Sequence, residues 1–210
     1  MSGSVGQTGA RSRLGNVSGA LLLGGYSDAL GCEIASYEIG GESLALRLAR
    51  RLSGLFEEVI LAGGEPPEGV PGRRVPDPPG PPGPLRGVVG ALGAAKTERV
   101  LVLAADLAMV GPEILLGLTA WPISDVVVPR TPPRIHYGCA IYRREPVLAA
   151  ARALLDRGES SPRGLVDQLD AQFLEGDDLA VLDPSGRALE KICGPEQIAR
   201  AEGLWRQEQV

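Results

Sequence analysis

The residues best placed to do chemistry stand in a glycine-containing loop, Leu22–Gly31, that directly follows an apolar run. Gly24 and Gly25 have no Cβ, so their backbone N–H groups can approach a ligand closely. In an open α/β sheet, ligands bind outside the carboxyl ends of the strands, where such a loop lies. The segment from residue 14 to residue 46 contains no Lys or Arg but four acidic residues. The loop therefore has a shape suited to phosphates without the positive charge that normally holds them.

A second candidate is Asp106, which ends the apolar run 100–105. At the carboxyl edge of a parallel sheet, such a carboxylate can ligate Mg²⁺ beside substrate phosphates. The alternative is an aspartate that caps a helix or closes a turn.

A third candidate combines Asp77 with the segment 83–87, Gly-Pro-Leu-Arg-Gly. A Gly-Pro turn predicts the start of a helix, whose N-terminal dipole favours an anion, and Arg86 falls in its first turn. The alternative is an ordinary helix start after a flexible loop.

The single histidine, His136, stands next to Tyr137, and no Ser/His/Asp order accompanies it. The cysteines, Cys32, Cys139 and Cys193, are far apart in the sequence. We therefore expect no Cys/His zinc site and interpret His136 as structural or exposed.

Apolar runs alternate with helical patterns, which predicts βαβ units and an α/β fold with a mostly parallel central sheet. The expected strands are 17–23, 58–62, 99–104, 125–129 and 137–143, with short edge strands at 172–175 and 180–182. The expected helices are 42–53, 85–95, 112–118, 146–156, 162–169 and 195–207. Residues 63–83 are dense in Pro and Gly and predict no regular element.

Length and composition limit the possible classes of protein. The 210 residues suit one domain, 17–210, after a Gly/Ser-rich tail, 1–16, that we expect to be disordered. A net charge of −5 argues against nucleic acid, and the absence of a run of about 20 apolar residues argues against a membrane span. The sparse, odd cysteine count predicts a reducing, cytoplasmic location. Only two of the 21 basic residues are lysines, Lys96 and Lys191.

In order and spacing, these segments resemble the molybdenum cofactor guanylyltransferase family of nucleotidyltransferases. The resemblance covers residues 17–202 and is carried by the segments 22–27, 40–41, 56–59, 83–87, 101–106, 136–144 and 194–202. It implies a three-layer Rossmann-like nucleotidyltransferase fold with helices on both faces of the sheet.

The resemblance also implies a reaction and its residues. The terminal phosphate of the molybdopterin cofactor attacks the α-phosphate of GTP, and pyrophosphate leaves. Asp106 would be the catalytic residue that binds Mg²⁺, and Asp77 would lie near the guanine or ribose. The remaining residues assigned to nucleotide contact are Leu22, Leu23, Gly24, Gly25 and Arg86.

The chain departs from the family pattern where the phosphates bind. Ala29 replaces an Arg, Glu33-Ile34 replaces Asp-Lys, Leu107-Ala108 replaces x-Pro after the aspartate, and 191–194 replaces an Asn-rich strand end. Each lost charge-assisted hydrogen bond is worth about 1.5–3 kcal/mol, so losing two costs on the order of 10²- to 10⁴-fold in rate. Compensating charge can come from elsewhere in the chain; the candidates are Arg11, Arg13, Arg73, Arg74, Arg86 and Lys191.

Two hypotheses follow. The first is a Mg²⁺-dependent transferase with a rearranged phosphate site, with guanine or another base selected by the loops. The second is an inactive protein of the same fold that binds a nucleotide or the pterin cofactor, or assists a molybdoenzyme or maturation partner. Restoring the two cations with the double replacement Ile34→Lys and Ala29→Arg should raise nucleotide affinity, and an unchanged or weaker affinity would show that the site is rebuilt for something else.

Overall fold

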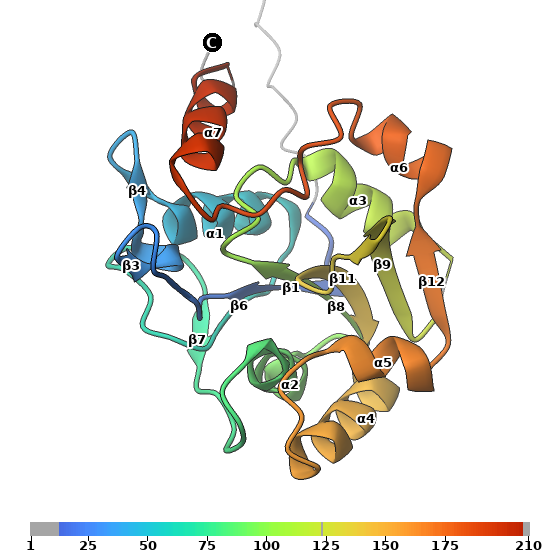
Figure 1. Cartoon of the computed structure of the whole chain (residues 1–210). Helices are drawn as coiled ribbons and strands as arrows, with labels where there is room; N and C mark the ends of the chain where they lie inside the picture. The colour runs from blue at the N-terminus through green and yellow to red at the C-terminus, as the bar shows by residue number, and fades with distance from the viewer. Residues whose placement is uncertain (1–12, 123, 208–210) are drawn as a thin grey trace, which may run out of the picture.

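A mostly parallel sheet forms the middle layer of the molecule, and helices cover both of its faces (Figure 1). The computed structural model describes residues 13–122 and 124–207. The sheet order is β10-β9-β11-β8-β1-β6-β7, and β12 pairs with β9. The strands are β1 (Val17–Leu22), β6 (Val59–Ala62), β7 (Arg73–Val75), β8 (Arg99–Ala104), β9 (Val126–Thr131), β10 (Arg134–Ile135), β11 (Cys139–Arg143) and β12 (Ala171–Leu174). The predicted fold class is confirmed.

The direction of the chain through the sheet reverses at β1. From β1 the chain moves outward to β6 and β7, and then crosses back to β8 on the other side of β1. Leu22 is in register with both Ala62 and Ala104, so three parallel strands end at the same level. This is a topological switch point, the position where open α/β sheets bind ligands.

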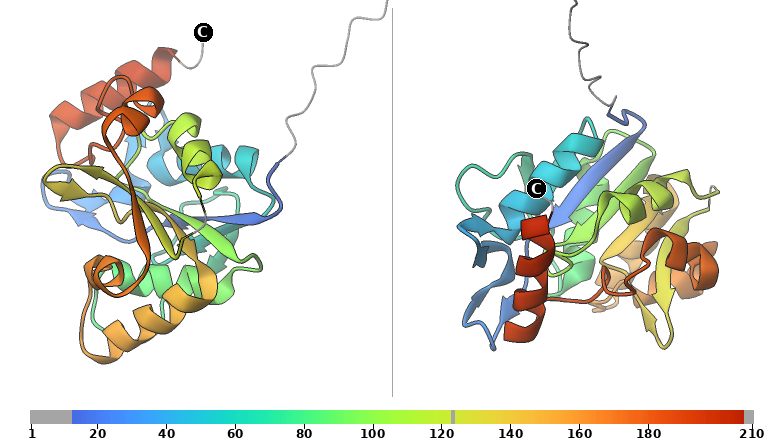
Figure 2. Two further views of the ribbon diagram at one scale, coloured as in Figure 1. Left: turned by 90° about the vertical axis from the view of Figure 1, so that its right-hand side faces the viewer. Right: turned by 90° about the horizontal axis from the view of Figure 1, so that it is seen from above.

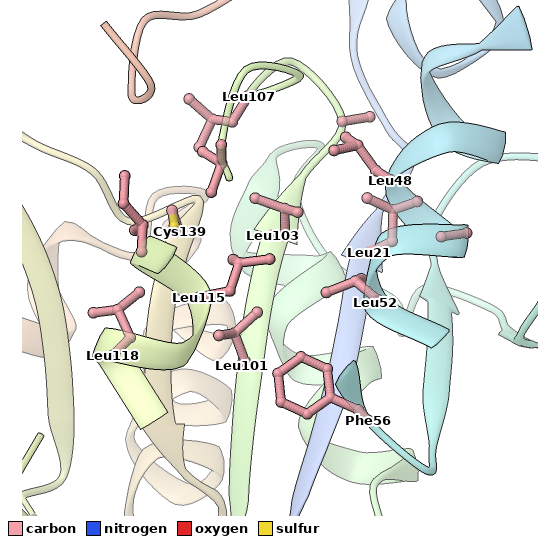
Figure 3. Packing of buried hydrophobic residues seen from close by; sticks show 14 of the residues in the cluster. Leu21, Leu48, Leu52, Phe56, Leu101, Leu103, Leu107, Leu115, Leu118 and Cys139 are labelled. Carbon is pink, nitrogen blue, oxygen red and sulfur yellow. The ribbon is translucent and has the colours of Figure 1, made fainter. Parts of the chain in front are cut away.

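The helices divide between the two faces of the sheet. One face carries α1 (Leu44–Leu55), α3 (Pro112–Ala120) and α6 (Gly176–Leu182), and the other carries α2 (Pro84–Ala94), α4 (Arg144–Asp156) and α5 (Arg163–Gln168). The leucines that recur every four residues in α1 are buried, as predicted. Leu48 and Leu52 pack with Leu21 and Phe56 (Figure 3). Ser43 caps this helix by accepting a hydrogen bond from the Leu46 amide.

Two predictions about short elements were wrong. The segment 63–83 contains β7, because Arg73–Val75 is free of Pro and Gly and an edge strand needs a partner on one side only. Residues 180–182 belong to α6 rather than to an edge strand; the two aspartates in the first turn of that helix suit its N-terminus. The other predicted edge strand, 172–175, is confirmed as β12.

A third apolar cluster, besides those on the two faces of the sheet, joins the C-terminal part of the chain to the segment that follows β1. After the 3-10 helix Ile34–Ser36 and the small hairpins β2–β3 (Tyr26–Ser27, Cys32–Glu33) and β4–β5 (Glu38–Ile39, Glu42–Ser43), the chain enters α1. The terminal helix α7 (Pro195–Gln207) packs against β4 (Figure 2). Ile34, Ile192 and Trp205 are buried in this one cluster. The segment between α6 and α7 crosses the molecule (Figure 1), and Leu30 of the glycine-containing loop packs against the cluster that buries Ile192.

Most of the expected tail, residues 1–12, lies outside the described residues. Leu14 exchanges backbone hydrogen bonds with Leu55 and Glu57 beside the start of β6. Within residues 13–122 and 124–207, no helix is both long and apolar enough to cross a membrane.

Replacing Glu58 with Gln should lower the free energy of unfolding by about 1–3 kcal/mol at pH 7. Its carboxylate accepts hydrogen bonds from the buried Ser18 hydroxyl (2.6 Å), the Lys96 amide (2.9 Å) and Arg73 (2.9 Å). Burial raises the pKa of Glu58, but these bonds outweigh it and the pKa lies below its ordinary value of 4.5. The stabilisation is therefore present above that pH and is lost as pH falls through the lowered pKa.

Urea unfolding of the wild type and the variant at pH 7 and at pH 3 tests this prediction. The difference in stability should shrink at the lower pH, and the exposed neighbour Glu57→Gln is the matched control. An equal difference at both pH values would contradict the assigned role.

Candidate functional site

The glycine pair that follows β1 forms an open loop at the switch point. Gly24 and Gly25 are exposed, and a Cβ added at either position would meet nothing within 4 Å. Gly25 has φ +136°, which side chains rarely adopt. Its carbonyl accepts a hydrogen bond from the Ile34 amide (2.9 Å), which closes the loop back on itself. The loop therefore presents backbone to solvent at the place where a ligand would bind.

Leu22 and Leu23 position this loop through their burial. Their side chains are core residues, 6% and 1% exposed. The Leu22 carbonyl accepts a hydrogen bond from Ala105, and the Leu23 amide donates to Ala62, both at 3.0 Å. Any ligand contact from these two residues would therefore come from their remaining main-chain atoms.

Asp106 lies next to this loop, because it follows Ala105 in the turn after β8. Its carbonyl accepts a hydrogen bond from the Ile192 amide, and its Oδ2 accepts one from Lys191 Nζ, both at 2.7 Å. Of the alternatives to a metal ligand, a helix cap is excluded, since Gly111 is the N-cap residue of α3, but Asp106 does lie in a turn. The side chain instead faces a cation that comes from 85 residues further along the chain.

The free oxygen of Asp106 suits a divalent cation. Oδ1 is buried and has no hydrogen-bond partner among the described residues. No group of three His, Cys, Asp or Glu side chains in the described part of the chain could hold a metal. Mg²⁺ usually takes only one or two protein carboxylates and completes its octahedron with water and substrate phosphates, so a single carboxylate fits it.

Asp77 lies at the same edge, against the glycine that follows β6. A Cβ at Gly63 would be 3.1 Å from Asp77 Oδ1, and Gly64 in turn lies against Leu23. Burial raises the pKa of Asp77, and Arg86, whose Nη2 is 3.7 Å from Asp77 Oδ2, partly opposes the rise. The structure thus places this carboxylate at the end of β6, and β1 lies between β6 and the strand β8 that Asp106 follows.

The turn 83–87 has a packing explanation. A Cβ at Gly83 would lie 2.6 Å from the Ser160 carbonyl oxygen, and that oxygen already accepts a hydrogen bond from the Leu85 amide (3.0 Å). Arg86 donates to the Pro78 carbonyl (3.0 Å) and so holds the proline-rich loop. The first turn of α2 therefore uses its polar groups within the protein, as the helix-start alternative predicts.

His136 packs into the β9–β10 hairpin beside the site. Its Nε2 lies 2.6 Å from Thr131 Oγ1, and its amide donates to the Pro129 carbonyl. Burial lowers the pKa of His136, and the nearby charges of Arg134 and Lys191 lower it further. His136 therefore has a structural position in this hairpin, and the lowered pKa favours its neutral form.

The candidate compensating cations differ in where the fold places them. Arg73 pairs with Glu58, Arg74 with Glu65 and Arg86 with Asp77, and Arg11 lies outside the described residues. Arg13 precedes β1 and is therefore at the opposite edge of the sheet from the glycine loop. Lys191 is the member of the set that contacts Asp106. The scarcity of lysine in the sequence marked Lys191 as a candidate, but its contact with Asp106 depends on the fold.

Comparison with known proteins agrees with this geometry. The strand order and switch point define the Rossmann-like nucleotidyltransferase class of folds. A solved structure from Archaeoglobus fulgidus, described as molybdopterin-guanine dinucleotide biosynthesis protein A, superposes with a TM-score of 0.76 at 18% identity over 90% of this chain and 99% of that one.

The chain belongs to the MobA-like NTP transferase domain family, whose model matches residues 19–198. A relative in Chloroflexus aggregans is 28% identical over 87% of this chain and 91% of its own length, and one in Pelotomaculum thermopropionicum is 34% identical over 65% and 68%. Both are named "probable molybdenum cofactor guanylyltransferase". The family expected from the sequence is confirmed.

Proposed function

We propose that this protein transfers a guanylyl group from GTP to the molybdopterin cofactor with the help of Mg²⁺. The observation that carries the proposal is the position of Asp106, with one free oxygen and one cation, beside an open glycine loop at the switch point. The names of the two relatives supply the substrates.

The proposed roles belong to residues along the carboxyl edge of the sheet. The exposed backbone N–H groups of Gly24 and Gly25 would contact the phosphates, and the Leu22 and Leu23 main chain would contact the nucleotide beside them, the Leu23 carbonyl as an acceptor from a donor group. Asp77, with Arg86 against it, would face the ribose or base. Asp106 would hold Mg²⁺ through Oδ1, and the bound ion would neutralise phosphate oxygens and orient them.

The chemistry needs little more from the protein than position and charge. A phosphate oxygen of molybdopterin forms a bond to the α-phosphorus of GTP, and the bond from that phosphorus to the bridging oxygen of the β-phosphate breaks. Pyrophosphate carries away the electron pair. A phosphate nucleophile is already ionised at neutral pH, so the residues contribute by alignment and by stabilising the developing charge.

Thermal unfolding with nucleotides tests the proposal. GTP with Mg²⁺ at about one hundred times its dissociation constant should stabilise the fold by about 2.7 kcal/mol. CTP and ATP, tested alongside, should stabilise it less. Adding molybdopterin should then release pyrophosphate.

Other outcomes would reject the proposal in different ways. No shift with any of the three nucleotides at millimolar concentration would count against a transferase. Binding without pyrophosphate release would favour an inactive nucleotide-binding protein, and stronger binding of CTP would change the assigned base.

A further inference from the structure

The main chain of Lys191 is fixed over Asp106 by its buried neighbour. The Ile192 amide donates to the Asp106 carbonyl, and the Ile192 side chain is 1% exposed. It packs in the cluster that contains Ile34 and Ala108. Lys191 therefore projects from a segment that a hydrogen bond and the burial of Ile192 hold against Asp106.

Ile34 is the residue that stands where the family resemblance expects a lysine. Its side chain is 6% exposed and lies in the same cluster as Ile192. The position that has lost a cation is thus part of the apolar support for the segment that supplies Lys191. The apolar residue at position 34 and the placement of Lys191 therefore depend on the same cluster.

The ammonium group of Lys191 keeps the capacity to bind an anion. Its side chain is 62% exposed, and Asp106 Oδ2 takes one of its three N–H donors. The other two donors can bind a phosphate while the contact with Asp106 persists. A lysine acts as a point charge toward phosphate, so it tolerates a short swing of its side chain.

We propose that Lys191 binds the β- and γ-phosphates of the nucleotide, and the pyrophosphate formed from them, in place of the cations absent from the first loop. The nucleotide part of this inference rests on the proposed function. The pyrophosphate part is independent of it, because pyrophosphate can be tested alone.

Lysine footprinting of the unmodified full chain tests the inference directly. The chain has two lysines, and Lys96 follows α2 beside Glu58, at the opposite edge of the sheet from Asp106. Acetylation is followed by mass spectrometry with Mg²⁺ alone, with Mg²⁺ and pyrophosphate, and with Mg²⁺ and GTP. Near-saturating pyrophosphate or GTP should slow the modification of Lys191 by roughly tenfold or more, because little free protein remains, and leave Lys96 unchanged.

The possible results separate this inference from the proposed function. Protection of Lys191 by pyrophosphate without any binding of GTP would support the pyrophosphate part of the inference and reject both its nucleotide part and the proposed function. A thermal shift with GTP while Lys191 remains unprotected would reject the inference and leave the function standing. Equal modification of Lys191 under all three conditions would overturn the inference.

Variants give a second, quantitative readout. Lys191→Ala should weaken pyrophosphate binding measured by calorimetry by roughly ten- to a hundredfold, the loss expected for one charge-assisted contact. Lys191→Arg should keep most of the affinity, and Lys96→Ala should keep all of it. Unchanged binding by Lys191→Ala would overturn the inference.

Discussion

Asp106→Asn should lower the rate of pyrophosphate release by about 10²- to 10³-fold, the loss typical of removing one preorganised electrostatic group from an active site. The substitution keeps the size of the side chain and removes its charge. It therefore weakens the proposed Mg²⁺ site and also releases Lys191 from its ion pair (2.7 Å). Steady-state kinetics with GTP and molybdopterin would measure the loss.

The control for this variant is Asp125→Asn. Asp125 forms an ion pair with Arg143. Arg143 is in register with Arg99 at the start of β8, which is the far end of that strand from Asp106. We expect that variant to react at the wild-type rate. An Asp106→Asn protein that keeps its rate within about threefold, less than one charge-assisted hydrogen bond supplies, would remove Asp106 from the mechanism.

Ile34→Lys should lower the free energy of unfolding by about 3–5 kcal/mol, the cost of an uncompensated buried charge. The side chain at position 34 packs with Ile192 and Ala108, and an ammonium group there has no partner to replace its water. Urea unfolding would measure the effect. Ile34→Met, which keeps the volume, should cost less than about 1.5 kcal/mol.

The same variant changes an expectation drawn from the sequence. If the lysine were simply missing from an intact site, restoring it with Ala29→Arg would raise nucleotide affinity. Because Ile34 supports the segment that carries Lys191, we now expect Ile34→Lys to lower the affinity, whereas Ala29→Arg, at an exposed position, should raise it alone. An increase in affinity with undiminished stability for Ile34→Lys would contradict this account of the cluster.

The layers of the fold were predictable because periodicity reports burial. Strands β1 and β8 are buried along most of their length, so they appear in the sequence as mostly apolar runs, and the leucine spacing of α1 marks the face it buries. The short elements β7 and α6 were not predicted correctly. Their few residues carry too little pattern, and pairing with β6 or packing on α3 decides their conformation.

The candidate site was predictable where it depends on the ends of strands. Asp106 and the glycine loop follow apolar runs, so their meeting at one edge follows from parallel strands. The contact between Asp106 and Lys191 could not be predicted, because the α6–α7 connection has no regular pattern that would fix its path across the molecule.

By itself the sequence determined the α/β class, the family and the lack of positive charge in the first loop, because these depend on residue types and on local periodicity. Only the tertiary structure decided which cation lies beside Asp106. Burial of Ile34 and Ile192 in one cluster brings the chain end to the switch point, and so places an ammonium group on Asp106.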